Sequence, residues 1–116
     1  MEIDFPPDMK VFLDDVVDSF AMWDLLIFFS KKELEMESSD RIAKLLGRQA
    51  DEMEKPMVKL EKMGLLTRVK RLDGETACQL NRAGSHYQGL EKFWVFNESQ
   101  ENRLRVLSYL LQKKVR

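Results

Sequence analysis

Three glycines divide the middle of the chain into segments that fit only short helices and a hairpin. Gly47 and Gly64 each follow apolar residues spaced at three- and four-residue steps. Glycine tolerates the positive φ with which helices commonly end, so each run predicts a helix that stops at its glycine. Gly74 follows Asp73, a pair typical of a tight turn between two strands. The pattern therefore predicts two short helices followed by a two-stranded hairpin.

The flanking residues set the bounds of these central elements. The alternation of Glu33 to Glu37 predicts a short strand, and the capping pair Ser38-Ser39 predicts the start of a helix. From Gln49 the apolar positions predict a second helix, formed around Met53, Met57, Leu60 and Met63. We therefore expect a helix-turn-helix over residues 38–64 and a hairpin over residues 65–82.

Longer amphipathic segments lie on both sides of this centre. After Pro6-Pro7-Asp8, apolar residues recur at helical steps as far as Ile27, which predicts a long first helix over residues 8–32. Further helices are predicted over residues 84–114, with Asn97 and Gln100 as a capping box. We expect one domain over residues 1–116, mainly α-helical with a small β-hairpin and with long N-terminal and C-terminal helices.

The order helix, strand, helix, turn, helix, hairpin is that of a winged helix-turn-helix. Three blocks lie within it: Ile42-Ala43-Lys44-Leu45-Leu46-Gly47, Leu60-Glu61-Lys62-Met63-Gly64-Leu65, and Leu80-Asn81-Arg82-Ala83-Gly84. These blocks resemble motifs of the MarR-type transcriptional regulators. The resemblance covers residues 38–84, and the terminal helices match only in placement. The resemblance implies a transcriptional regulator that binds double-stranded DNA as a homodimer, with the helix starting near Asp51 as the recognition helix.

Charge is distributed unevenly along the chain although the total is close to zero. Residues 1–40 hold eleven acids and three bases, a net charge of −8, and residues 41–116 hold sixteen bases and nine acids, a net charge of +7. An acidic, solvated first helix beside a mildly basic body explains this distribution as well as an electrostatic footprint for DNA does.

The candidate DNA-binding residues are those that a winged helix would direct at one duplex. They lie in the turn, along the recognition helix and on the strand that leads into the wing: Arg48, Gln49, Lys55, Lys59, Arg68, Lys70 and Arg71. Contacts from such cations to phosphates set affinity and orientation without reading sequence. Basic residues on an exposed strand also protect a sheet edge from aggregation, so the wing residues keep both interpretations.

The start of the recognition helix is acidic, with Asp51, Glu52 and Glu54 where related regulators carry neutral or basic residues. Three carboxylates there would repel phosphates. Asp51 as N-cap, with Glu54 three residues on, is a purely structural explanation. Pro56 lies either in the second turn or at the first position of a helix that begins near Lys55. The acidic tip favours the alternative function, a winged helix that binds a protein partner instead of DNA.

Apolar stripes on the helices at both ends of the chain predict self-association, because a small winged core cannot cover them all. We expect a homodimer whose interface is formed by the long first and last helices and includes the stripe of Leu104, Leu107, Leu110 and Leu111. The aromatic residues before it are more typical of a core or subunit interface than of a ligand pocket: Tyr87, Phe93, Trp94 and Phe96. A pocket between them and the first helix stays open as an alternative.

No catalytic machinery is recognisable, and the chain is not expected to be an enzyme. His86 and Cys78, each the only one of its kind, cannot form a zinc site with ordinary spacing, and no glycine-rich phosphate loop is present. We therefore expect no metal and no cofactor. Cys78 lies on the returning strand and is expected to be a small, half-buried residue rather than a thiol sensor.

Location follows from what the chain lacks. The most apolar stretch, Phe20 to Phe29, is interrupted by Asp24 and is well short of the roughly 20 residues that span a bilayer. The N-terminus lacks the basic start and apolar centre of a secretory signal, and Cys78 has no partner for an internal disulfide. These features predict a cytoplasmic protein that does not enter a membrane.

Overall fold

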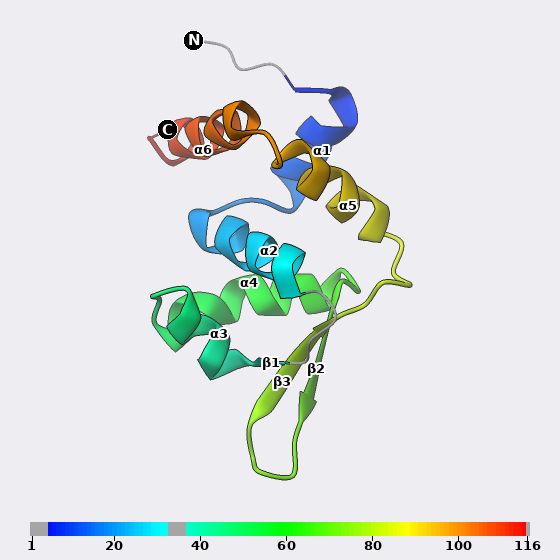
Figure 1. Cartoon of the computed structure of the whole chain (residues 1–116), viewed down its shortest axis with the longest axis vertical. Coiled ribbons are helices and arrows are strands. Elements are labelled where there is room, and N and C mark those ends of the chain that lie inside the picture. The colour runs from blue at the N-terminus through cyan, green and yellow to red at the C-terminus, as the bar shows by residue number, and fades with distance from the viewer. Residues whose placement is uncertain (1–4, 33–36, 116) are drawn as a thin grey trace.

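The computed structural model describes residues 5–32 and 37–115, and six helices and three strands lie within these ranges. Figure 1 shows α2 and α4 at the centre, with α1, α5 and α6 at one end and the hairpin of β2 and β3 at the other. The mainly helical winged-helix architecture predicted from the sequence is confirmed. The elements are α1 (Pro7–Asp15), α2 (Phe20–Lys32), β1 (Glu37–Ser38), α3 (Ser39–Leu45), α4 (Ala50–Lys62), β2 (Leu66–Lys70), β3 (Thr76–Leu80), α5 (Tyr87–Phe96) and α6 (Gln100–Val115).

The N-terminal segment forms two helices, so the prediction of one continuous helix over residues 8–32 is wrong. α1 ends at Asp15, and the hydroxyl of Ser19 accepts a hydrogen bond from the backbone N–H of Met22 at 3.1 Å. A serine that caps the next helix competes with continuation of the preceding one, because its side chain replaces a backbone acceptor. The turn between the helices buries Val16 and Val17 together.

The predicted helix-turn-helix is present as α3 and α4. Ser38 caps α3 as expected, accepting a hydrogen bond from the backbone N–H of Arg41 at 3.1 Å. Gly47 has φ of 67° and Gly64 has φ of 76°, so both lie in the left-handed region that favours glycine. Pro56 lies inside α4, which leaves that helix without one backbone donor in its second turn.

The sheet has three antiparallel strands in the order β1-β3-β2. The predicted hairpin is confirmed, with Gly74 in its turn at φ of 89°, and β1 adds a third strand on the far side of β3. Cys78 of β3 pairs with Arg68 of β2 and with Glu37 of β1. Of the strand predicted over residues 33–37, only Glu37 belongs to the residues that the structure describes.

A core of apolar side chains from all six helices, β2 and β3 holds these elements together. The predicted aromatic cluster belongs to it: Phe93 and Tyr87 are buried, and Trp94 and Phe96 pack against it. Cys78 is fully buried rather than half-buried, and this burial raises the pKa of its thiol.

α5 and α6 meet at Asn97, which does not have the predicted N-cap role. Its side-chain amide donates to the carbonyl oxygen of Phe93 at 2.7 Å, so Asn97 closes α5 instead. Ser99 caps α6, accepting from the backbone N–H of Asn102 at 3.3 Å. The prediction of a capping box at Asn97 is therefore wrong, because its side chain is already bonded to the preceding helix.

α6 is attached to α1 by polar contacts around Tyr109. The Tyr109 hydroxyl donates to the carboxylate of Asp14, and Lys10 and Lys113 lie within 3.5 Å of the same carboxylate. The hydrogen bond from Tyr109 lowers the pKa of Asp14. The Tyr109 ring also meets Phe5 edge to face, with ring centres 5.3 Å apart.

Candidate nucleic-acid interface

The outward surface of α4 is a narrow ridge of four residues. With about 100° between successive residues, positions three, four and seven apart share a face of a helix. The inner face carries the buried residues Met53, Pro56, Met57 and Leu60. The opposite face, which we call the outer ridge, carries Asp51, Lys55, Val58 and Lys62. The three charged residues are exposed, and Val58 is half-buried.

On the wing side of α4, one arginine binds two glutamates. Arg68 of β2 donates from both terminal nitrogens to the carboxylate of Glu54 at 3.0 Å, and from Nε to Glu61 at 2.7 Å. This forked geometry suits a planar guanidinium, and its hydrogen bonds lower the pKa of Glu54. We call this arrangement the Arg68 clamp. The Arg68 side chain is only 16% exposed, and its charge is directed at α4.

On the opposite side of α4, acids from the N-terminal part of the chain pair with two candidate residues. Arg48 donates from Nε to Asp24 at 2.7 Å and from Nη1 to Glu52 at 3.1 Å, and the hydrogen bond with Asp24 raises the pKa of Arg48. Lys59 pairs with Asp18 at 2.9 Å. The acidic excess before residue 41 therefore neutralises part of the basic excess that follows it.

The capping of α4 differs from the prediction, and this changes how the three carboxylates at the start of α4 are interpreted. The backbone N–H of Gln49 donates to the carboxylate of Glu52 at 3.1 Å, so Gln49 is the N-cap and Asp51 is not. Since Glu52 pairs with Arg48 and Glu54 with the clamp, Asp51 is the one tip carboxylate without an ion pair in the described part of the chain. Because two of the three carboxylates are paired with arginines, the start of α4 would repel phosphates less than the sequence suggests.

The wing, the hairpin of β2 and β3, carries an exposed lysine without an ion pair to any described residue. Lys70 is exposed at the end of β2 and has no ion-pair partner within the described ranges. Arg71 pairs with Asp73 at 3.5 Å, and Asp73 also accepts from the backbone N–H of Glu75 at 2.9 Å, which fixes the turn. Leu72, at the end of the hairpin, is fully exposed.

The structure thus separates the seven candidate residues by charge pairing. Four hold ion pairs: Arg48, Lys59, Arg68 and Arg71. Lys55 and Lys70 hold none with any residue that the structure describes, and Gln49 is exposed at the start of α4. Sequence reasoning missed Lys62, which is exposed on the outer ridge and also lacks a described ion-pair partner. Its seven-residue spacing from Lys55, two helical turns, is the signal that would have identified it.

α6 has two apolar faces. Val106 and Leu110 are buried in the core of the chain itself. Leu104 and Leu111, with 57% and 56% of their surface exposed, lie about 120° around the helix from them, together with the half-buried Leu107. Of the four leucines predicted to form a subunit interface, three therefore make an outward face and Leu110 contributes to the core.

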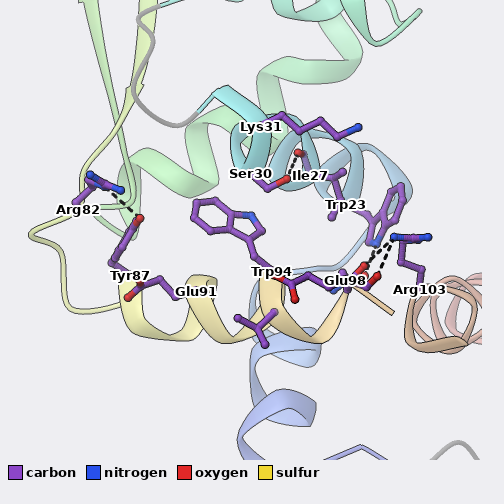
Figure 2. A pocket seen from close by; sticks show the side chains of 12 residues that line it. Trp23, Ile27, Ser30, Lys31, Arg82, Tyr87, Glu91, Trp94, Glu98 and Arg103 are labelled. Carbon is purple, nitrogen blue, oxygen red and sulfur yellow. Dashed lines mark hydrogen bonds between the residues drawn. The ribbon is translucent and has the colours of Figure 1, made fainter. Parts of the chain in front are cut away.

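A hollow of about 730 Å³ lies between α2, α5 and the start of α6, beside the aromatic cluster (Figure 2). The indole N–H of Trp94 donates to the carbonyl oxygen of Leu26 at 2.9 Å, and that of Trp23 lies 3.4 Å from the side-chain oxygen of Asn97. Both indole donors are therefore already bonded. The hollow offers ring faces and a rim of charged side chains, among them Lys31, Arg103 and Glu98.

The described residues include neither a metal-binding cluster nor a membrane-spanning helix. Among residues 5–32 and 37–115, no three His, Cys, Asp or Glu side chains come together in a way that could hold a metal ion. None of the helices in these ranges is long and apolar enough to cross a membrane.

Comparison with known proteins finds a similar fold among solved structures. No protein-family model and no curated protein sequence matches the chain. Among solved structures, a possible transcriptional regulator from Methanosarcina mazei Go1 aligns with a TM-score of 0.61 at 16% identity, covering 87% of this chain and 93% of that one. A probable transcriptional regulator from Pseudomonas aeruginosa aligns with a TM-score of 0.59 at 20% identity, covering 92% and 80%.

A third match is a mutant of MepR from Staphylococcus aureus bound to an oligodeoxyribonucleotide, with a TM-score of 0.58 at 15% identity, covering 90% of this chain and 83% of that one. MepR itself is a transcription regulator of a multidrug efflux pump. These likenesses confirm the predicted resemblance in fold to MarR-type regulators.

Proposed function

We propose that the chain is a cytoplasmic, non-enzymatic transcriptional regulator that binds double-stranded DNA through the outer ridge of α4 and the hairpin of β2 and β3. The observation that carries this proposal is the pair Lys55 and Lys62, exposed on the outer ridge and without ion-pair partners in the described chain. Lys70 adds a third such cation on the wing. The similarity in fold to transcriptional regulators, one of them solved with an oligodeoxyribonucleotide, supports the same function.

The residues that form ion pairs beside the outer ridge would hold α4 and the hairpin in position for binding by these lysines, rather than contact DNA themselves. The Arg68 clamp ties β2 to α4, and the pairs of Arg48 and Lys59 tie α4 to the N-terminal helices. Fixing the helix and the wing before binding reduces the ordering that binding requires. The three lysines then neutralise phosphates and release counterions, which gives affinity that depends on salt and little on sequence.

A fluorescence-anisotropy titration of duplex DNA at several salt concentrations tests the proposal. Changing Lys55, Lys62 or Lys70 to alanine should each lower the magnitude of the slope of log affinity against log salt by about 1, because one phosphate contact is lost. Lys92→Ala is the matched control, since Lys92 is exposed on α5 and paired with Asp8. An equal loss in the control would contradict the assignment.

A protein-binding role is the second candidate, favoured by the extent of charge pairing at this face. Arg48, Lys59, Arg68 and Arg71 are each paired with a carboxylate, and Asp51 is exposed at the tip of α4. The same titration separates the two candidates. Binding that is undetectable at about 50 mM salt, weaker than the usual non-specific range of ~10⁻⁴ to 10⁻⁶ M, would favour the protein-binding role.

We further propose that the regulator acts as a homodimer through the outward face of α6. Replacing Leu104 and Leu111 together by aspartate should convert a dimer to a monomer, because two charges would be buried in the interface. Light scattering at tens of micromolar protein measures the mass. Leu45→Asp is the control, since Leu45 is similarly exposed but lies on α3. A wild-type monomer, or a dimer that survives the double substitution, would disprove this interface.

A further inference from the structure

We infer that Val58 reads the 5-methyl group of thymine in the major groove, so that the regulator prefers A·T-rich duplexes by an apolar contact. This inference rests on the proposed function and adds base readout to a surface otherwise made of phosphate contacts.

The position of Val58 on α4 is the first support. The outer ridge lies opposite the buried face of Met53, Met57 and Leu60. Val58 is at the middle of this ridge, three residues after Lys55 and four before Lys62, which places it within about 6 Å along the axis of either lysine. If both lysines contact phosphates on the two sides of the groove, the side chain between them faces the base edges.

The chemistry of the side chain is the second support. Val58 is the one apolar residue of the outer ridge, and it has no hydrogen-bonding group. Val58 is half-buried, so part of its side chain is accessible, and as a β-branched residue it contributes less to helix stability than alanine would. Among the groups displayed in the major groove, the thymine methyl is the apolar one, and small apolar side chains contact it.

The glutamates on both sides of the outer ridge are held in ion pairs, so they do not compete with Val58 for the base edges. The Arg68 clamp holds Glu54 and Glu61 on the wing side, and Arg48 holds Glu52 on the other. These three carboxylates are therefore engaged by arginines instead of competing for base-edge donors. The shape and charge of the ridge, an apolar centre between two cations, complement a methyl group between two phosphate strands.

The test compares two duplexes of alternating adenine and thymine. They differ only in that one carries deoxyuridine in place of thymidine. This change removes the methyl group and keeps every phosphate and hydrogen-bonding group. By anisotropy, wild type should bind the thymine duplex more tightly by about three- to four-fold for each methyl buried, the factor for one buried CH₂ group. In Val58→Ala this preference should decrease, because the two γ-methyl groups of valine are removed, while alanine maintains the helix.

Lys62→Ala is the matched control, and it should weaken binding to both duplexes by the same factor and keep their ratio. Equal binding of the two duplexes by wild type would overturn the inference and leave the proposed function intact. A thymine preference that is undiminished in Val58→Ala would also overturn it, because the preference would then not come from Val58. Failure of wild type to bind either duplex would refute the proposed function and this inference with it.

Discussion

A chain carrying both Lys55→Glu and Lys62→Glu should bind duplex DNA at least about 100-fold more weakly than wild type at about 50 mM salt. With about 0.9 counterions released per phosphate contact, one contact contributes roughly ten-fold in affinity at that salt concentration. Removing two contacts accounts for the 100-fold loss, and the new carboxylates add repulsion. The measurement is fluorescence anisotropy on a single duplex across a range of protein concentrations.

The control for this double reversal must change the net charge by the same amount elsewhere. Lys31 on α2 and Lys92 on α5 are exposed and lie outside the proposed interface, so Lys31→Glu with Lys92→Glu serves this purpose. A comparable loss of affinity in this control would show that overall charge, and not the outer ridge, governs binding. Circular dichroism should give the same helix content for both variants, because glutamate is a good helix former.

Replacing Phe93 with alanine should lower the free energy of unfolding by about 3–5 kcal/mol, the range for deleting a buried aromatic side chain. Phe93 is fully buried, and its ring lies 5.4 Å from that of Phe12 between α5 and α1. The substitution would leave a cavity at the junction of these helices. Urea denaturation followed by circular dichroism measures the loss.

Val95 on the same helix provides the comparison for Phe93. Its side chain is 64% exposed, so Val95→Ala should change the free energy of unfolding by no more than about 0.5 kcal/mol. A loss below about 1 kcal/mol for Phe93→Ala would mean that the core closes around the deleted ring, and that α1 and α5 are less firmly packed than the structure indicates.

Features of the fold that depend on neighbours in sequence could be predicted from sequence. Gly47, Gly64 and Gly74 have the positive φ that their places after helices and in a turn require. Ser38 caps α3 as its position indicated. Each of these signals acts within a few residues. The break at Ser19 was missed because the apolar spacing continues through it, although a capping serine was present in the sequence.

The candidate site was predicted less completely, because its electrostatics depend on residues far apart in the chain. The Arg68 clamp joins residues separated by 7 and 14 positions, and the pair of Arg48 with Asp24 spans 24 positions. Nothing in the spacing of these residues reveals that they meet. The sequence therefore named seven candidate residues, but only the tertiary structure shows that four of them are already held in ion pairs.

The weak attachment of α6 gives the chain a region of low local stability. Among the α6 side chains that the structure describes, Val106 and Leu110 are the buried ones, and the contacts of Tyr109 with Asp14 are exposed to solvent. Segments with few buried contacts open at a lower free energy than the whole protein unfolds, so the amide hydrogens of α6 should exchange with solvent earlier than those of α4. In the proposed dimer this opening would also require the subunits to separate, and the exchange rate of α6 would then depend on protein concentration.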